Sequence, residues 1–249
     1  QHKIQLLSDA AQQTIDWPLL HTLFDRPAPA AVPCTVPPPR VRLAVARDAA
    51  FCFTYAETLE AFRDAGAEVV FFSPLRDTAL PENIGGLYLP GGYPELHARE
   101  LSENTSLLRE IKRKIESGLP TAAECGGFLY LGQSLTDAEG QSWPMVGVLP
   151  GEAKDAGRLV RFGYAALSAD SDSLLFRAGE SFPIHEFPHW DSTANGVALA
   201  AKKPLGGAEW RCGSVNEHFY AGFPHLYWAG TPLPQRFAAA AENYRRDHD

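Results

Sequence analysis

The hydrophobic pattern of the chain changes at about residue 41. From there on, short and nearly continuous apolar runs alternate with segments in which apolar residues recur every three or four positions. The short runs are typical of strands buried on both faces, and the intervening segments are typical of helices. The predicted strands are residues 41–46, 68–72, 85–89 and 121–124.

Two helices are predicted between these strands. The first begins at Thr54-Tyr-Ala-Glu57, whose spacing is that of a capping box, and ends at Gly66. The second begins at the cap residue Asn104 and ends at Gly118. This alternation predicts an α/β fold: a three-layer, mostly parallel twisted sheet with helices on both faces.

The second half of the chain is more strand-like, and its apolar runs are shorter. Short strands at this spacing predict antiparallel additions to the parallel sheet. The candidates are residues 161–167, 182–187, 197–201, 208–212 and 214–220, followed by a closing helix at about 234–246.

A proline-rich stretch separates this pattern from the first part of the chain. Six prolines within residues 27–39 favour an extended backbone, which indicates an interdomain linker or, alternatively, a proline-rich recognition motif. Residues 1–26, with a short helix predicted at 17–24, resemble the end of a preceding domain. The predicted organisation is a domain remnant over 1–26, a linker over 27–40 and one domain over 41–249.

Composition narrows the functional classes. A chain of 249 residues that is 45% hydrophobic can bury a full core, which predicts a soluble globular protein. A net charge of -8 without any basic run argues against nucleic-acid or anionic-membrane surfaces. The four cysteines form no C-x-x-C pair, so neither a metal site nor a disulfide framework is predicted, and the cytoplasm is the expected location.

The candidate chemistry centres on Cys125, within the sequence Thr121-Ala-Ala-Glu-Cys-Gly-Gly-Phe-Leu-Tyr-Leu131. A strand that runs into a tight turn and then a helix is typical of a nucleophile elbow. Gly126 and Gly127 permit the close backbone approach that such a turn needs, and a helix N-terminus favours the reactive thiolate. The alternative is that Cys125 is a small buried hydrophobe.

A second glycine-bearing segment, Leu89-Pro-Gly-Gly-Tyr-Pro-Glu-Leu96, follows the strand before the cysteine strand. The carboxyl ends of parallel strands meet at one edge of a sheet, so this loop is expected beside Cys125. Taken alone, it indicates only a turn. Next to a nucleophile, its N–H groups predict an oxyanion or substrate site. The predicted residues of that site are Gly91, Gly92, Tyr93 and Gly126.

A cysteine nucleophile needs a base, and histidine is the usual one. His225 is preferred because it follows Pro224 at the mouth of a late apolar strand, where the sheet order could place it beside Cys125. The remaining alternatives are His185, His189 and His218.

Four segments together resemble the glutamine amidotransferase domain at the C-terminus of cobyrinic acid a,c-diamide synthases. They are residues 89–96, 123–131, 185–187 and 224–226, and the likeness covers about residues 41–246. The resemblance implies a class I amidotransferase with a flavodoxin-like core, in which Cys125 attacks the side-chain amide of glutamine. It also implies that His225 moves the protons, and that the N–H groups of Gly92 and Gly126 hold the oxyanion.

The resemblance implies partners as well. Residues 1–6 and 14–16 are faintly similar to the end of the ATP-dependent synthetase domain. In the family that domain uses the ammonia to amidate the a and c carboxylates of a corrinoid in cobalamin biosynthesis. ATP and Mg²⁺ are expected in that missing domain. No cofactor is expected here, because the chain has no G-x-x-x-x-G-K-S/T phosphate loop. Glutamine, the synthetase domain and, through it, a corrinoid are the expected partners.

The group that orients His225 is the open point. In many class I glutaminases a glutamate lies two residues after the histidine. At that position this chain has Tyr227. Tyr227 can hydrogen-bond the imidazole, but a phenol does not stabilise an imidazolium as a carboxylate does. Glu186 is either an alternative orienting carboxylate or a surface ion-pair member, and the ion-pair role is favoured. Two alternative functions also remain: a degenerate, non-catalytic module, and a cysteine amidase acting on another substrate.

Overall fold

The computed structural model describes residues 2–25, 27 and 38–248. By its internal contacts the chain divides into two units, Gln1–Thr35 and Val36–Asp249. Most of the predicted linker, residues 28–37, lies outside the described residues.

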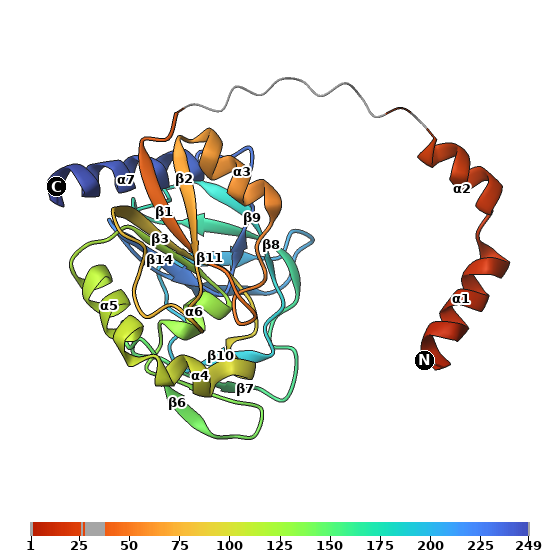
Figure 1. Cartoon of the computed structure of the whole chain (residues 1–249), viewed down its shortest axis with the longest axis horizontal. Helices are drawn as coiled ribbons and strands as arrows, with labels where there is room; N and C mark the ends of the chain where they lie inside the picture. Colours follow the sequence, from red (N-terminus) through yellow and green to blue (C-terminus); the bar gives the residue numbers. More distant parts are fainter. Residues whose placement is uncertain (1, 26, 28–37, 249) are drawn as a thin grey trace. The chain divides into compact units, whose positions relative to one another are not determined.

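The first unit contains two helices, α1 (His2–Thr14) and α2 (Trp17–Phe24), shown in red in Figure 1. The second confirms the helix predicted at 17–24. The Asp16 carboxylate accepts a hydrogen bond from the Leu19 N–H at 3.0 Å, and Pro18 fits the first turn, where its missing N–H has no cost. Neither helix has a buried residue, so this unit has no core of its own among the described residues.

The second unit is built on a six-stranded sheet in the order β13-β14-β4-β3-β1-β2. All neighbouring strands are parallel except β13, which pairs antiparallel with β14. The four predicted apolar strands form the contiguous parallel part β4-β3-β1-β2, which confirms a mostly parallel sheet. The strands are β1 (Val41–Ala46), β2 (Ala67–Phe72), β3 (Ile84–Leu89), β4 (Thr121–Glu124), β13 (Ser214–Asn216) and β14 (Phe219–Gly222).

Helices cover both faces of this sheet (Figure 1). The helical segments are α3 (Ala56–Asp64), η1 (Pro94–His97), α4 (Ala98–Glu103), α5 (Thr105–Glu116), α6 (Gly126–Tyr130) and α7 (Leu233–His248). On one face, Ile111 of α5 and Phe128 of α6 share a buried cluster with Leu87 of β3. On the other, Phe62 of α3 and Phe237 of α7 belong to a second cluster. No helix among the described residues is long and apolar enough to cross a membrane.

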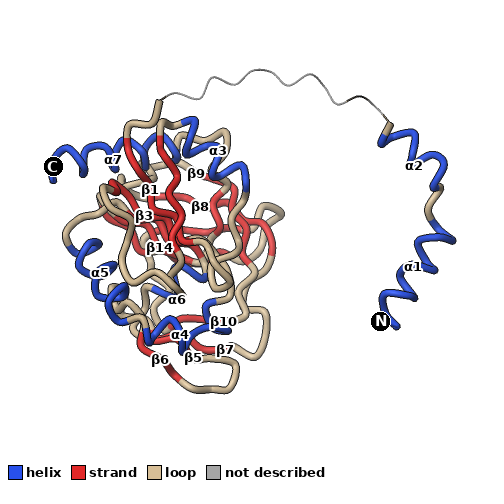
Figure 2. Tube along the Cα trace, in the orientation of Figure 1, coloured by secondary structure: helices blue, strands red, loops and turns tan. Residues whose placement is uncertain are grey.

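The remaining strands form two further sheets, drawn in red in Figure 2. One has the order β12-β11-β8-β9-β15 and packs Leu167 and Ile184 into the same cluster as Phe62. Its strands are β8 (Gly163–Ala169), β9 (Ser181–Glu186), β11 (Leu199–Lys202), β12 (Glu209–Cys212) and β15 (His225–Leu226). The other has the order β10-β7-β5-β6, with strands β5 (Ser134–Thr136), β6 (Ser142–Pro144), β7 (Glu152–Asp155) and β10 (Trp190–Ser192).

Strands are therefore present in each predicted stretch, but only the predicted strand 214–220 joins the parallel sheet. It is divided into β13, which is antiparallel, and the start of β14, which pairs parallel with β4. An alternating pattern shows which face of a strand is buried, and it does not show which strand is its partner. The strands between residues 134 and 155 had no prediction because each has only three or four residues, with polar positions among them.

One predicted helix cap is wrong, and the other, Asn104, is the N-cap residue of α5 but makes no side-chain cap hydrogen bond. Helix α3 begins at Ala56 with Tyr55 as its N-cap residue, and no side chain caps it. Asn104 does precede α5, but its side-chain amide donates hydrogen bonds to the carbonyls of Pro74 and Asp77, each at 2.8 Å. That amide ties α5 to the connection between β2 and β3, so the tertiary contact replaces the local cap.

We expect Phe62→Ala to lower the free energy of unfolding by about 3–5 kcal/mol, because Phe62 is fully buried. Its ring packs edge-to-face on that of Trp228, with centroids 5.0 Å apart, so a cavity would form between α3 and Trp228. Urea unfolding followed by circular dichroism measures the change. Leu205→Ala is the control, since Leu205 is 98% exposed and its loss should change the value by less than about 0.5 kcal/mol. Equal effects of the two substitutions would contradict this packing.

Candidate active site

Cys125 lies at the turn between β4 and α6, as predicted. Its backbone has φ 49° and ψ -105°, a positive φ that is uncommon outside glycine and costs about 1–3 kcal/mol. The Cys125 N–H donates to the Gly222 carbonyl at 2.8 Å, which fixes the turn against β14. This strained strand-to-helix turn is the backbone of a nucleophile elbow. Helix α6 spans only Gly126–Tyr130, so its dipole adds little to the electrostatics of the thiol.

The glycine-bearing loop packs directly on the elbow. A Cβ at Gly127 would lie 2.1 Å from the Leu89 carbonyl oxygen, and a Cβ at Gly126 would lie 3.0 Å from the Gly92 nitrogen. The Gly127 N–H donates to the Pro90 carbonyl at 3.0 Å. The two glycine pairs therefore let the two predicted segments approach at backbone contact distance.

The N–H groups of Gly92 and Gly126 donate no hydrogen bond to any described residue. Both glycines line the same cavity as the Cys125 side chain. Free backbone donors beside a nucleophile are what an oxyanion hole requires. The geometry is thus compatible with the predicted role of these two residues.

His225 is buried, and three groups surround its imidazole. The Phe187 ring stacks on it with centroids 5.2 Å apart and planes 10° apart, and the Phe53 ring meets it edge-on at 4.9 Å. Gly91 leaves the space for its ring, because a Cβ there would lie 2.5 Å from His225 Cε1. His225 Nδ1 lies 3.7 Å from the carboxylate of Glu124, the residue before the cysteine. The strand order explains this position, since β14, which ends shortly before His225, pairs with β4.

Glu124 is a member of the site that the sequence interpretation missed. Its buried carboxylate accepts hydrogen bonds from Trp228 Nε1 at 2.7 Å, the Tyr88 hydroxyl at 3.1 Å and the Leu226 N–H at 3.4 Å. Within the described residues His225 is its only ion-pair partner. A signal was available in the sequence: a glutamate inside a fully buried strand needs a specific partner.

Neither of the two groups predicted to orient His225 contacts it. Tyr227 is 55% exposed, and within the described residues it makes no hydrogen bond. Glu186 forms an ion pair with Arg161 at 2.5 Å, which agrees with the alternative that Glu186 is an ion-pair member. The pair does not lie on the surface, because Glu186 is buried. Tyr227 was a candidate because it is near His225 in the sequence, and Glu186 because it lies in the segment 185–187, whereas Glu124 comes from β4, which pairs with the strand that precedes His225.

The electrostatics of the cluster favour a charged imidazole. Burial by itself lowers the pKa of His225, but the Cys125 sulfur and the Glu124 carboxylate stabilise the protonated ring and raise the pKa to about 10. His225 Nε2 is buried and has no hydrogen-bond partner among the described residues. Catalytic hydrogen bonds are often long before substrate binds, so this atom is available to a proton in transfer.

The other candidate histidines occupy different places. His189 lines the same cavity as Cys125. His185 is the strand partner of His225, and its pKa is lowered by burial and by the nearby charges of His225 and Lys203. His218 is half-exposed and lies beside Glu217, away from the elbow. The structure therefore brings His225, and not these three, against the Glu124–Cys125 pair.

The cavity at Cys125 has a volume of about 260 Å³. Most of its lining side chains are apolar or aromatic, and they come from the glycine loop, the elbow and the segment after β9. The predicted Tyr93 is one of them, so every predicted site residue except Gly91 and His225 lines it. The lining residues are Gly92, Tyr93, Glu95, Cys125, Gly126, Leu129, Phe187, Pro188, His189, Trp190 and Phe223.

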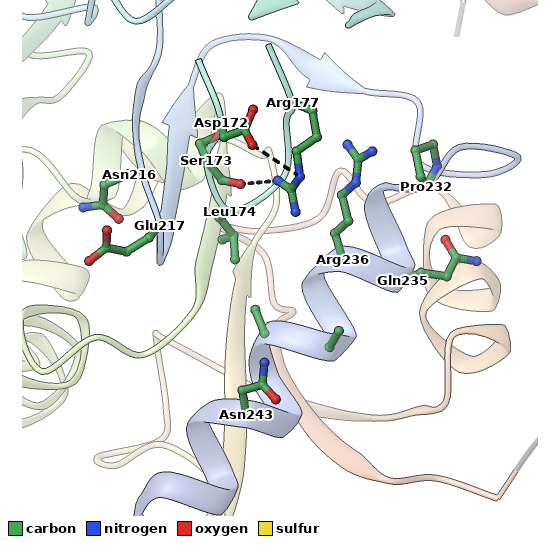
Figure 3. Close-up of a pocket in the computed structure, with 12 residues that line it drawn as sticks. Asp172, Ser173, Leu174, Arg177, Asn216, Glu217, Pro232, Gln235, Arg236 and Asn243 are labelled. Carbon is green, nitrogen blue, oxygen red and sulfur yellow. Dashed lines mark hydrogen bonds and ion pairs between the residues drawn. The ribbon is translucent and has the colours of Figure 1, made fainter.

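A larger surface hollow, of about 860 Å³, lies between α7 and the β8–β9 connection (Figure 3). Its two arginines are already engaged: Arg236 pairs with Glu180 at 2.6 Å, and Arg177 pairs with Asp172 at 4.0 Å. The first pair holds the closing helix to the β8–β9 connection and the second lies within that connection, so we assign the hollow a structural role. Within the described residues no three histidine, cysteine or acidic side chains are grouped to hold a metal ion.

The fold and the elbow define the class of protein, and comparisons with known proteins give the same class. The chain superimposes on PurLQS from Thermotoga maritima with a TM-score of 0.55 and 18% identity, covering 82% of this chain and 98% of that one. A solved glutamine amidotransferase matches with a TM-score of 0.52 and 17% identity, over 81% of this chain and 98% of that chain. The fold is that of class I glutamine amidotransferases.

The family follows from the sequence match. The family model for the CobB/CobQ-like glutamine amidotransferase domain matches residues 42–229, and the chain belongs to this family. A cobyrinate a,c-diamide synthase from Caldanaerobacter subterraneus is 41% identical over 75% of this chain and 42% of its own length. The corresponding protein from Synechocystis is 39% identical over 96% of this chain and 52% of its own length. The chain thus spans about half the length of the curated relatives it matches.

We expect His225 to remain an imidazolium through neutral pH and to lose its proton near pH 10. A folded-state pKa above the ordinary value of 6.5 means that this proton stabilises the fold fully below about pH 6.5, and that the stabilisation is lost as the pH rises towards 10. Nitrogen-15 NMR of labelled histidines measures the titration. In Glu124→Gln the pKa should fall, because one stabilising charge is removed. An unshifted His225 in that variant would contradict the assignment.

Proposed function

We propose that this chain is a glutaminase domain that hydrolyses glutamine through a thioester on Cys125. One observation carries the proposal: buried His225 and Glu124 cluster with the partly exposed Cys125, which opens onto a cavity with two free backbone N–H groups. A nucleophile, a proton carrier and oxyanion donors in one place are the parts that acyl transfer requires.

In the proposed reaction, the Cys125 thiolate attacks the side-chain amide carbon of glutamine. The N–H groups of Gly92 and Gly126 stabilise the oxyanion that forms, and the loss of one such donor typically costs about 3–4 kcal/mol of barrier. His225 gives its proton to the nitrogen, and ammonia leaves as the thioester forms. Water then attacks the thioester carbon, His225 takes its proton, and glutamate departs with return of the thiolate.

Glu124 serves as the positioning residue in this proposal. Its carboxylate is fixed by Trp228, Tyr88 and the Leu226 N–H, so it holds the Nδ1 edge of His225 and stabilises the imidazolium. In serine and cysteine enzymes an acid beside the histidine has this function. Glu124 thereby replaces the glutamate that this chain lacks at position 227.

The ammonia, we propose further, serves an ATP-dependent synthetase domain that amidates the a and c carboxylates of a corrinoid. The support is that the matched relatives are cobyrinate a,c-diamide synthases and are about twice as long as this chain. ATP and Mg²⁺ would belong to that domain, and a cytoplasmic location fits the pathway. A degenerate module is less well supported, because a module without turnover has no need for an assembled Cys–His–Glu cluster.

Cys125→Ser should reduce glutamate release from L-glutamine by at least about a thousandfold, because the hydroxyl is a far weaker nucleophile. A coupled glutamate assay measures the rate. Cys52→Ser is the matched control: Cys52 is an exposed free cysteine, does not line the cavity at Cys125, and its replacement should leave the rate unchanged. Full activity of Cys125→Ser would contradict the proposed nucleophile and favour another hydrolytic mechanism.

Glu124→Gln should lower kcat by about 10²–10⁴-fold with a smaller change in KM, since the carboxylate acts on His225 and not on the substrate. Tyr227→Phe tests the earlier alternative at the same time and should retain kcat, because its hydroxyl has no partner among the described residues. The two variants are compared by their kcat values and by the pH dependence of kcat. The opposite ranking would assign the orienting role to Tyr227.

A further inference from the structure

Glu95 is a buried acid that the proposed mechanism does not use. It lies in η1, two residues after Tyr93, and only 8% of the residue is exposed. Its side chain lines the same cavity as Cys125, and it is the only acidic residue among the described residues that does so. The other lining side chains, including Leu129 and Trp190, are largely apolar; His189 is the one other titratable group of opposite charge type, and it forms no ion pair with Glu95 among the described residues.

The chain pairs its other buried glutamates. Glu186 has Arg161 as a partner, and Glu124 has three hydrogen-bond donors and His225. No described residue forms an ion pair with Glu95. Burial therefore raises the pKa of Glu95 to about 7, with its own backbone N–H offsetting a small part of the effect.

An unpaired buried carboxylate is costly, because removal of a charge from water is repaid only by a partner of opposite charge. Such a group persists at a site where a ligand supplies the partner. At this site the partner must be a cation that reaches the cavity together with an amide at Cys125. The α-ammonium group of an amino acid meets both conditions, because it lies at the other end of the molecule from the side-chain amide.

We propose that Glu95 binds the α-ammonium group of the substrate, so that the cavity selects the side-chain amides of α-amino acids over amides without that cation. The inference rests on the proposed glutaminase function. In this arrangement one end of glutamine is held at Cys125 and the Gly92 and Gly126 N–H groups, and the other end is held at Glu95. The cavity volume of about 260 Å³ is sufficient for one such molecule.

The pairing also has a consequence for selectivity. A site built around a buried polar group rejects an analogue that lacks the matching group, because the group at the site is then left unpaired. 4-Carbamoylbutyrate is glutamine without its α-amino group, so it retains the amide and the carboxylate and lacks only the cation. Its affinity relative to glutamine reports directly on Glu95.

The test measures binding by isothermal titration calorimetry with the full chain carrying Cys125→Ser, which prevents turnover. In this parent we expect glutamine to bind at least about 30-fold more tightly than 4-carbamoylbutyrate. Adding Glu95→Gln should weaken glutamine binding by a similar factor and leave 4-carbamoylbutyrate binding unchanged or tighter. Glu95→Asp, which keeps the charge, should lose less.

Glu103→Gln is the matched control. Glu103 is an exposed acid on the neighbouring helix α4, where it pairs with Arg99, and its replacement should change neither affinity. Circular dichroism of each variant checks that it is folded.

The contrary outcomes are distinct. If Glu95→Gln weakens both ligands equally, Glu95 has only a structural role and the inference is overturned. If it changes neither, the ammonium group binds elsewhere. If the parent binds no glutamine at all, the glutaminase proposal itself fails, and the inference fails with it.

Discussion

The interaction on which the site depends is the contact between the buried carboxylate of Glu124 and the imidazole of His225. Successive residues of a strand point to opposite faces, so the adjacent Glu124 and Cys125 reach different layers of the molecule. Glu124 accepts hydrogen bonds from Tyr88, Leu226 and Trp228, which belong to the core cluster that includes the five-stranded sheet. Cys125 packs against the other core cluster, which lies beneath α5 and α6. His225 lies in β15, just after the strand β14 that pairs with β4, and it thus joins the two layers at the end of β4.

This arrangement explains why the site needs both glycine segments and two sheets. The paired glycines bring the loop after β3 against the elbow, and Gly91 leaves the space that the imidazole fills. The five-stranded sheet supplies β15, which carries His225, and the segment after β9 supplies the Phe187 ring that stacks on it. Removal of one partner of a buried ion pair strongly destabilises a protein, because the other charge is left uncompensated. The contacts that position His225 therefore also stabilise the fold.

Local patterns in the sequence predicted the parallel sheet and the positions of Cys125 and His225. Apolar runs define strands without knowledge of their neighbours, and the turn at Cys125 depends on glycines that lie next to it in the chain. The partner of His225 was not predictable in this way, because Glu124 reaches it across two paired strands and is fixed by Trp228 from a distant segment. For the same reason the Asn104 side chain was predicted to cap α5, whereas its amide group donates hydrogen bonds to the carbonyls of Pro74 and Asp77.

The most direct measurement is covalent labelling with 6-diazo-5-oxo-norleucine, a glutamine analogue with an electrophilic carbon, followed by peptide mass mapping. It reports on the thiol and the glutamine pocket together, and it requires no partner domain. If Cys125 is the nucleophile of a glutaminase, it is the only cysteine that the reagent modifies, and free glutamine suppresses the modification. Absence of labelling, or labelling at Cys125 that glutamine does not suppress, would contradict a glutamine pocket with an activated thiol.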